Sequence, residues 1–347
     1  MLLDGPPALV DAWPGAAPFP LSGWFERNGF TPFWAGVLVF VAAFLLFQTL
    51  GTLLAVGPRA ADVGWMAALI EAADTAAFVA AHPRLLLGGN ALGQALGFGL
   101  VAWAAARLST RRAAAFLRLR APDPAGLGLA VVGWAALYPL VLWLGELNGR
   151  LPLPEWLQGL DEMRGEMLEG LLLGGGVSTA FLFVTVALTP ALFEELLFRG
   201  YLLRQTERRF GPRAAIVGVG VAFGLYHLSV AQAVPLSVLG VYLCFVVWAT
   251  GSVWTGVLVH LLNNGVAVVA AGVARNTPGF DPDAVGELGG PWYVAAGLAV
   301  AGGVAVVAVG RLLLARREAA TGGRPDAAPV PNPPSESPTA APVAVPS

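Results

Sequence analysis

Charge, cysteine and histidine are scarce in this sequence. Only 12% of the 347 residues are charged, lysine is absent, there are three histidines, and Cys244 is the only cysteine. A lone cysteine cannot form a disulfide within the chain, which excludes a disulfide-stabilised fold. Soluble domains carry about 25% charged residues, so an ordinary soluble domain is excluded as well. Because the net charge is only −2, we expect no nucleic-acid partner.

Apolar residues dominate the chain instead. They make up 56% of it, too many for a disordered protein, and the 44 glycines follow no collagen-like triplet period. A membrane-spanning helix needs about 20 mostly apolar residues. Eight segments meet this requirement, at about 32–56, 85–106, 126–145, 175–203, 214–231, 234–250, 252–273 and 290–310. The sequence therefore predicts an all-α, polytopic membrane helix bundle with about eight transmembrane helices in a lipid bilayer.

The segments outside these spans have different characters. Residues 1–31 contain no basic stretch ahead of an apolar run, so we expect a short surface leader rather than a signal peptide. The loops 57–84 and 146–172 have the pattern of amphipathic surface helices. The Pro- and Ala-rich tail, 318–347, is expected to be disordered. The predicted organisation is a leader (1–31), N-terminal spans with surface loops (32–174), spans four to seven (175–273), a last span (274–317) and the tail (318–347).

The positions of the arginines indicate an orientation. They gather in every second loop, at 107–120, 204–213 and 311–317. Loops rich in Lys and Arg stay in the cytoplasm, so an eight-span count places both termini there. The all-arginine composition favours a prokaryotic source, and we expect the protein in a prokaryotic plasma membrane.

Ionisable residues inside membrane spans are costly and mark functional sites by default. The predicted spans contain few of them, and these fall within 194–264, together with two amides: Glu194, Glu195, Arg199, His227, His260, Asn263 and Asn264. The third histidine, His82, lies in a loop. The sequence therefore concentrates its polar chemistry in spans four, five and seven.

Helical spacing separates the roles of the two adjacent glutamates. Successive residues differ by about 100° around a helix, so Glu194 and Glu195 face different directions. Glu195 and Arg199 are four residues apart and can form an ion pair on one face. Pro190 removes a backbone hydrogen bond and can kink the helix. Such a kink would direct Glu194 into the bundle.

Three short motifs carry these polar residues. Each motif contains one pair of residues spaced by four positions, so that both side chains lie on one face of a helix. They read Glu194-Glu195-Leu-Leu-Phe-Arg199, Phe223-Gly-Leu-Tyr-His227 and His260-Leu-Leu-Asn-Asn264. In this order and inside predicted spans, they resemble the EExxxR, FxxxH and HxxxN series of the CPBP (Abi) intramembrane endopeptidases, the family that includes the CAAX prenyl endopeptidases. The resemblance covers about 175–272.

The resemblance implies a membrane-embedded hydrolase, an endopeptidase or protease of the CAAX-box processing type that acts on a membrane-associated protein or peptide. By similarity to the family, Glu194 and His227 would activate a water, and His260 and Asn264 would stabilise the oxyanion. Glu195 would orient the site, Arg199 would hold it, and Phe223 would support His227. The family resemblance favours a mechanism with no metal or other cofactor.

Other chemistries remain to be weighed against this one. Glu194, His227 and His260 could be three zinc ligands with water in the fourth place, although there is no HExxH motif. A serine mechanism lacks a GxSG motif, an aspartyl mechanism lacks an intramembrane Asp pair, and Cys244 is expected to be a small apolar filler. A non-catalytic transporter, immunity or scaffold protein could use the same cluster for proton relay or packing, but no internal repeat of the transporter type is evident.

The depth of the glutamates sets a condition on the fourth span. If that span ended at Arg199, Glu194 would lie only about 7–8 Å below the cytoplasmic boundary. His227 is separated from Arg213 by about 21 Å of helix and would lie much deeper, so the two side chains could hardly share one water. We therefore predict a helix that runs unbroken through Gly200 to at least Leu203. Four side chains, those of Glu194, His227, His260 and Asn264, would then converge in a cavity that opens to the cytoplasm.

Overall fold

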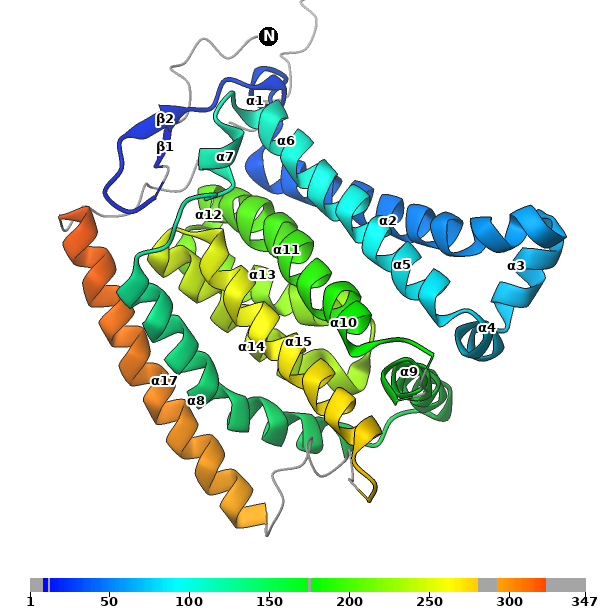
Figure 1. Ribbon diagram of the computed structural model, residues 1–347. Coiled ribbons are helices and arrows are strands. Elements are labelled where there is room, and N and C mark those ends of the chain that lie inside the picture. The colour runs from blue at the N-terminus through cyan, green and yellow to red at the C-terminus, as the bar shows by residue number, and fades with distance from the viewer. Residues whose placement is uncertain (1–8, 12, 174–175, 280–291, 323–347) are drawn as a thin grey trace, which may run out of the picture.

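The computed structural model describes residues 9–11, 13–173, 176–279 and 292–322 (Figure 1). In this part of the chain the helices form one bundle, preceded by a hairpin of two antiparallel strands, β1 (Leu9–Asp11) and β2 (Pro18–Pro20). Seven helices there are long and apolar enough to cross a membrane, and an eighth apolar helix is shorter. The predicted all-α class, that of an integral membrane protein, is confirmed.

The N-terminal helices form an arm of the bundle (Figure 1). After α1 (Trp24–Arg27), the long helix α2 (Pro32–Val63) lies beside a second span built from α5 (Pro83–Gln94), the wide turns of η1 (Ala95–Leu100) and α6 (Val101–Ser109). Two short helices, α3 (Trp65–Ala73) and α4 (Thr75–Ala81), join them. The helix contains the predicted first span, 32–56, and continues to Val63, where Gly64 ends it with a positive φ of 86°.

Two helices lie between this arm and the motif-bearing segment. Past the short α7 (Ala113–Phe116), Asp123 accepts a hydrogen bond from the Gly126 N–H and so caps α8 (Pro124–Gly149), which contains the predicted third span. The following helix, α9 (Glu155–Leu173), occupies most of the predicted surface region 146–172. Both regions expected to hold surface helices are thus largely helical, as the sequence indicated.

The fourth span is one continuous run of helical turns from Thr179 to Phe210. It comprises α10 (Thr179–Leu182), η2 (Phe183–Leu188), α11 (Thr189–Glu195), η3 (Leu196–Leu202) and α12 (Leu203–Phe210), and η2 and η3 are wider π-helical turns. The prediction of an unbroken helix through Gly200 to at least Leu203 is confirmed, and the helix continues to Phe210. The widened turn η2 directly precedes Pro190, whose missing N–H removes the tighter hydrogen bond there.

The C-terminal half corrects several sequence boundaries. The helix α13 (Pro212–Tyr226) is followed by α14 (Val230–Thr250) and α15 (Val253–Asn276). The predicted span 214–231 is wrong at its end, because His227 terminates α13 and Ser229 caps α14 by accepting from the Gln232 N–H. The last helix, α17 (Trp292–Thr321), passes the predicted tail boundary at 318 by four residues. The remaining tail, 323–347, lies outside the described residues.

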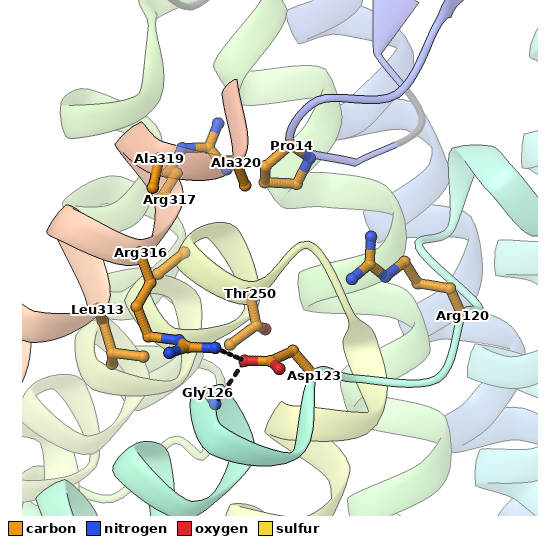
Figure 2. Close-up of a pocket in the computed structure, with 11 residues that line it drawn as sticks. Pro14, Arg120, Asp123, Gly126, Thr250, Leu313, Arg316, Arg317, Ala319 and Ala320 are labelled. Atoms are coloured by element: carbon orange, nitrogen blue, oxygen red, sulfur yellow. Dashed lines mark hydrogen bonds and ion pairs between the residues drawn. The ribbon is translucent and has the colours of Figure 1, made fainter. Parts of the chain in front are cut away.

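The arginine-rich segments meet at one end of the bundle, next to the N-terminal hairpin. Arg316, near the end of α17, forms an ion pair with Asp123 at the start of α8 (Figure 2). Two other arginines at this end bind segments that are far apart from them in the chain. Arg204 donates to the Asp11 and Phe116 carbonyls, and Arg208 forms an ion pair with Glu26. The prediction that these loops share one side is therefore confirmed.

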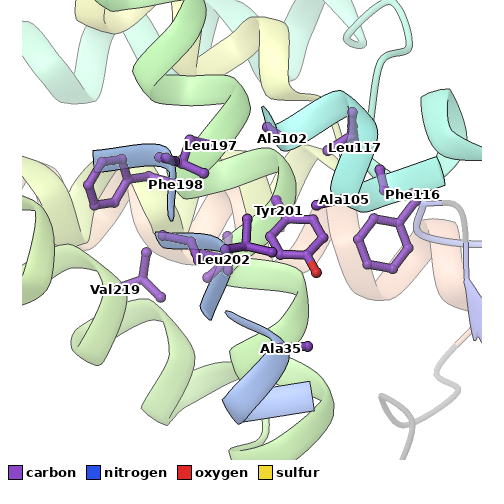
Figure 3. Close-up of a cluster of buried hydrophobic side chains, with 14 of the residues drawn as sticks. Ala35, Ala102, Ala105, Phe116, Leu117, Leu197, Phe198, Tyr201, Leu202 and Val219 are labelled. Atoms are coloured by element: carbon purple, nitrogen blue, oxygen red, sulfur yellow. The ribbon is translucent and has the colours of Figure 1, made fainter. Parts of the chain in front are cut away.

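The largest apolar core packs the motif-bearing helix against the N-terminal arm (Figure 3). Phe198 and Tyr201, both on η3, are completely buried, and the Tyr201 ring lies 5.8 Å from that of Phe116. Figure 3 shows Ala102 and Ala105 of α6 beside these side chains. This packing fixes the segment that carries the two motif glutamates.

A close helix contact in the arm gives the first testable prediction. A Cβ added at Gly93 would lie 2.7 Å from the Gly51 Cα on α2, whereas Gly88 has open space. We expect Gly93→Ala to lower the melting temperature of the purified protein, at a cost of about 1–3 kcal/mol, since two backbones would have to separate. Gly88→Ala is the matched control and should melt like the wild type; equal melting of both variants would contradict the contact.

The orientation of the bundle is a second prediction. We expect Arg111→Cys and Glu166→Cys, each in a Cys244→Ser background, to react with a membrane-impermeant maleimide from opposite faces, with the residue-111 site cytoplasmic. Both positions are exposed, and Cys244 is buried. Labelling of both sites from the same face would refute the orientation.

Candidate active site

Three helical segments bring the motif residues together. Glu194 and Glu195 end α11, Arg199 lies on η3, and His260 lies near the middle of α15. The residues Glu195 and Arg199 are 0% exposed, and Glu194 and His260 are 3% exposed. Such polar groups are stable inside an apolar bundle only when they are paired, so their partners define the site.

Glu195 is the centre of a buried ion-pair network. Its Oε1 atom accepts a 2.7 Å hydrogen bond from Arg199 Nη1 and lies 3.0 Å from His260 Nδ1. The Arg199 guanidinium also donates to the Gly240 carbonyl on α14 and lies 4.1 Å from the centre of the Phe223 ring. The i,i+4 pairing predicted for Glu195 and Arg199 is confirmed, and Glu195 additionally holds His260.

A small residue on α15 makes room for this carboxylate. A Cβ at Gly256, one turn before His260, would clash with the Glu195 Oε2 atom. That oxygen has no hydrogen-bond partner among the described residues. The glycine therefore allows α15 to approach closely enough for His260 to reach Glu195.

The hydrogen bonds of His260 select one tautomer. Because the Glu195 carboxylate can only accept, the proton lies on Nδ1. Nε2 is then an acceptor for the Asn264 Nδ2 group, 3.3 Å away, which also donates to the Val186 carbonyl on η2. The structure thus links Glu195, His260 and Asn264 in a chain, and the amide of Asn263 donates to Asn264 Oδ1.

Glu194 points away from Glu195 and has a different partner. Its Oε1 atom accepts a 2.8 Å hydrogen bond from the Tyr226 hydroxyl, which lies at the end of α13. Its buried Oε2 atom has no partner among the described residues. This oxygen is therefore left to accept a hydrogen bond from a group that binds at the site. The separate directions expected of the two glutamates are therefore observed.

His227 lies where α13 ends. Its Nδ1 atom is 2.8 Å from the Phe223 carbonyl, so Nδ1 carries the proton and Nε2 keeps its lone pair. The turn is held from outside by α9, where Arg164 donates to the His227 carbonyl and Asp161 accepts from the Ala231 N–H. No sequence pattern indicated that a surface helix would fix this histidine.

Phe223 connects the two histidines. The centre of its ring lies 5.0 Å from that of His227 and 5.7 Å from that of His260, and both contacts are edge-to-face. The Tyr226 ring is 4.6 Å from His227 and 5.9 Å from Phe98 of η1, so the N-terminal arm also reaches the site. The second motif thus supplies an aromatic wall as well as a histidine.

Sequence reasoning missed Tyr226 and Gly256. Tyr226 stands inside the second motif, and the useful signal was its hydroxyl, a hydrogen-bond donor within an otherwise apolar segment. No sequence signal paired Gly256 with Glu195, because their approach depends on how α11 and α15 cross. Cys244, expected to be an apolar filler, is buried among core residues on α14.

The zinc alternative would require Glu194, His227 and His260 on one ion. Among the described residues, no group of three His, Cys, Asp or Glu side chains is found that could hold a metal ion. Both ring nitrogens of His260 have protein partners, Glu195 and Asn264. To bind zinc, His260 would have to give up one of these two contacts.

Comparison with known families agrees with the motif pattern. Residues 176–266, about a quarter of the chain, match the family model described as type II CAAX prenyl endopeptidase Rce1-like. No curated protein and no solved structure matches the chain. The matched residues include all three motifs and the helices α10 to α14 with the first part of α15. The resemblance drawn from the motifs is thus confirmed for this part of the chain: residues 176–266 match the Rce1-like, CAAX-type endopeptidase family.

Proposed function

We propose that the protein is an intramembrane endopeptidase that hydrolyses a peptide bond of a membrane-associated, CAAX-like substrate with a water activated by Glu194 and His227. The observation that carries the proposal is the pair of unused acceptors at the site. Glu194 Oε2 is buried and unpaired, and His227 Nε2 keeps a lone pair. Two acceptors of this kind can bind a water and remove its proton as it attacks a carbonyl carbon.

The remaining polar groups would act on the other oxygen of the reaction. As the water attacks, the substrate carbonyl becomes an oxyanion that needs preorganised donors. The Asn264 amide would turn one N–H from His260 Nε2 or from the Val186 carbonyl toward this oxygen. His260, held by Glu195 at Nδ1, would orient that amide. Proton return from Glu194 to the departing amine would complete hydrolysis.

Location and family support the proposed substrate class. The site lies within helices that are long and apolar enough to span a membrane, so we expect a substrate that is embedded in or attached to the bilayer. The family match favours a C-terminal CAAX-type sequence. A panel of such peptides, with and without a prenyl group, tests whether the lipid is required. Cleavage by the purified wild-type protein would distinguish the enzyme from a transporter, immunity or scaffold protein.

The central prediction concerns Glu194. We expect Glu194→Gln to reduce kcat by about 10²–10⁴, since it removes the base but keeps the side chain's shape. His227→Ala, His260→Ala and Asn264→Ala should lose activity in the same range. Peptide cleavage followed by mass spectrometry measures the loss, and near-normal cleavage by Glu194→Gln would contradict the mechanism.

Glu195→Gln is the matched comparison at the adjacent position. It leaves the Arg199 charge without its partner in the interior, which costs about 3–5 kcal/mol, so this variant should melt well below Glu194→Gln.

A chelation experiment tests the zinc alternative. Loss of cleavage on addition of a chelator, restored by zinc, would support that alternative.

Tyr226 is predicted to position Glu194. Tyr226→Phe keeps the ring packing and removes only the donor to Glu194 Oε1, so we expect kcat to fall about tenfold or more with little change in KM. Tyr242→Phe is the control, because its buried hydroxyl donates to the Ala130 carbonyl away from the motifs. If both variants kept full activity, or lost it equally, the role of Tyr226 would be disproved.

A further inference from the structure

The turn between α13 and α14 has a strained backbone directly after His227. Leu228 adopts a φ of 53°, a left-handed conformation that a residue with a Cβ rarely takes. Leu228 is exposed, so burial of its own side chain does not hold it there. In the described part of the chain, Arg118 is the only other residue besides glycine with a positive φ. Contacts from elsewhere must therefore hold the backbone next to His227.

Three side chains from outside the motifs bind the backbone of this turn. Arg164 on α9 donates to the His227 carbonyl, and Asp161 on the same helix accepts a 2.9 Å hydrogen bond from the Ala231 N–H. Asn148, near the end of α8, donates to the carbonyl directly before Ala231. These partners lie 63 to 82 positions away from the turn in the sequence. The conformation of the turn therefore depends on α8 and α9.

The helix α9 is attached to the bundle along one face. Asp161 and Arg164 lie on this face at the turn, and Leu171 continues it into an apolar cluster with Leu182 and Val268. Leu182 belongs to the fourth span and Val268 to α15. Figure 1 shows α9 at the end of the bundle away from the hairpin. One helix outside the motifs thus connects both of these motif-bearing helices with the turn at His227.

The charges of α9 suit the two backbone groups that they bind. A guanidinium donates to the carbonyl and a carboxylate accepts from the N–H, and hydrogen bonds with one charged partner are stronger than neutral ones. Both side chains are partly buried, which limits their exchange with water. Two strong contacts on either side of Leu228 can therefore offset the strain of its backbone.

We propose that Arg164 and Asp161 are positioning residues that hold the His227 ring at Glu194 through the backbone of this turn. The inference rests on the proposed function, in which Nε2 of His227 helps to activate the water. Nδ1 of the ring is bound to the Phe223 carbonyl of the same helix, so a movement of the last turn of α13 would carry the ring with it. A displacement of about 1 Å is enough to cost a large part of the rate.

The first test compares two substitutions at Arg164 in the full-length protein. Arg164→Met keeps most of the side-chain length and removes the donors. We expect its kcat for peptide cleavage to fall about 10- to 100-fold with little change in KM, because the histidine is displaced while the substrate still binds. Arg164→Lys keeps a charged donor and should retain most of the wild-type kcat. A lower melting temperature of Arg164→Met with an unchanged kcat would show a merely structural contact and overturn the inference.

Hydrogen exchange measured by mass spectrometry gives a second readout that needs no cleavage. Arg164→Met and Asp161→Ala should each speed amide exchange in residues 228–232 about tenfold or more, since each loses a charge-assisted hydrogen bond. Unchanged exchange in both variants would overturn the inference, whatever the activity of the wild type. Should Arg164→Met not fold, Asp161→Ala is used for both measurements, with the same expected direction.

Arg84→Met is the matched control. Arg84 is an exposed arginine that donates to the Gly176 carbonyl and so binds a backbone group away from the turn. This variant should keep the wild-type kcat and the wild-type exchange of residues 228–232. An equal loss of kcat in Arg84→Met and Arg164→Met would show a general effect of the lost charge and overturn the positioning role.

The failure of this inference can be distinguished from the failure of the proposed function. Wild-type cleavage that depends on Glu194 but not on Arg164 or Asp161 would overturn the positioning role alone. If the wild type cleaved no peptide, the proposed function would be overturned and the positioning role with it.

Discussion

The buried pair of Glu195 and Arg199 is the constraint on which the site depends. Transferring these charges from water into an apolar bundle is costly, and only close, well-oriented partners offset the cost. Arg199 therefore binds Glu195, the Gly240 carbonyl and the face of Phe223 at once, which ties η3 to α14 and α13. The position of Glu195 in turn fixes Nδ1 of His260 on α15. A charge pair within one helix thus sets the relative positions of four segments.

Widened helical turns in the fourth span make a backbone carbonyl available to a side chain of α15. In a regular α-helix each carbonyl is occupied by the N–H four residues later. In η2, just before Pro190, the Val186 carbonyl instead accepts from Asn264 on α15. The π-turns of η2 and η3 lie on either side of Glu194 and Glu195. Local departures from α-helical geometry therefore supply backbone acceptors next to the side chains with the chemistry.

Two ion pairs of the bundle lie in different surroundings. At the motif residues, Glu195 and Arg199 are fully buried and the Phe223 ring lies against the guanidinium, so the apolar interior strengthens their hydrogen bond. At the arginine-rich end, Arg316 is about half exposed and the ion pair with Asp123 is open to the surroundings. The attraction between the buried pair is therefore strong, whereas solvent screens the exposed one.

The sequence by itself determined the membrane class, the number of apolar helices, the motif residues and the pairing of Glu195 with Arg199, because apolar length and i,i+4 spacing are local properties. It did not locate helix ends such as those at Val63 and Tyr226, which depend on single residues. Gly64 ends α2, and Ser229 caps the start of α14. Only the tertiary structure decided that Tyr226 meets Glu194, that Gly256 admits Glu195, and that Arg164 binds the turn at His227. These contacts join residues 32 to 63 positions apart, and how closely helices cross depends on packing that no local pattern encodes.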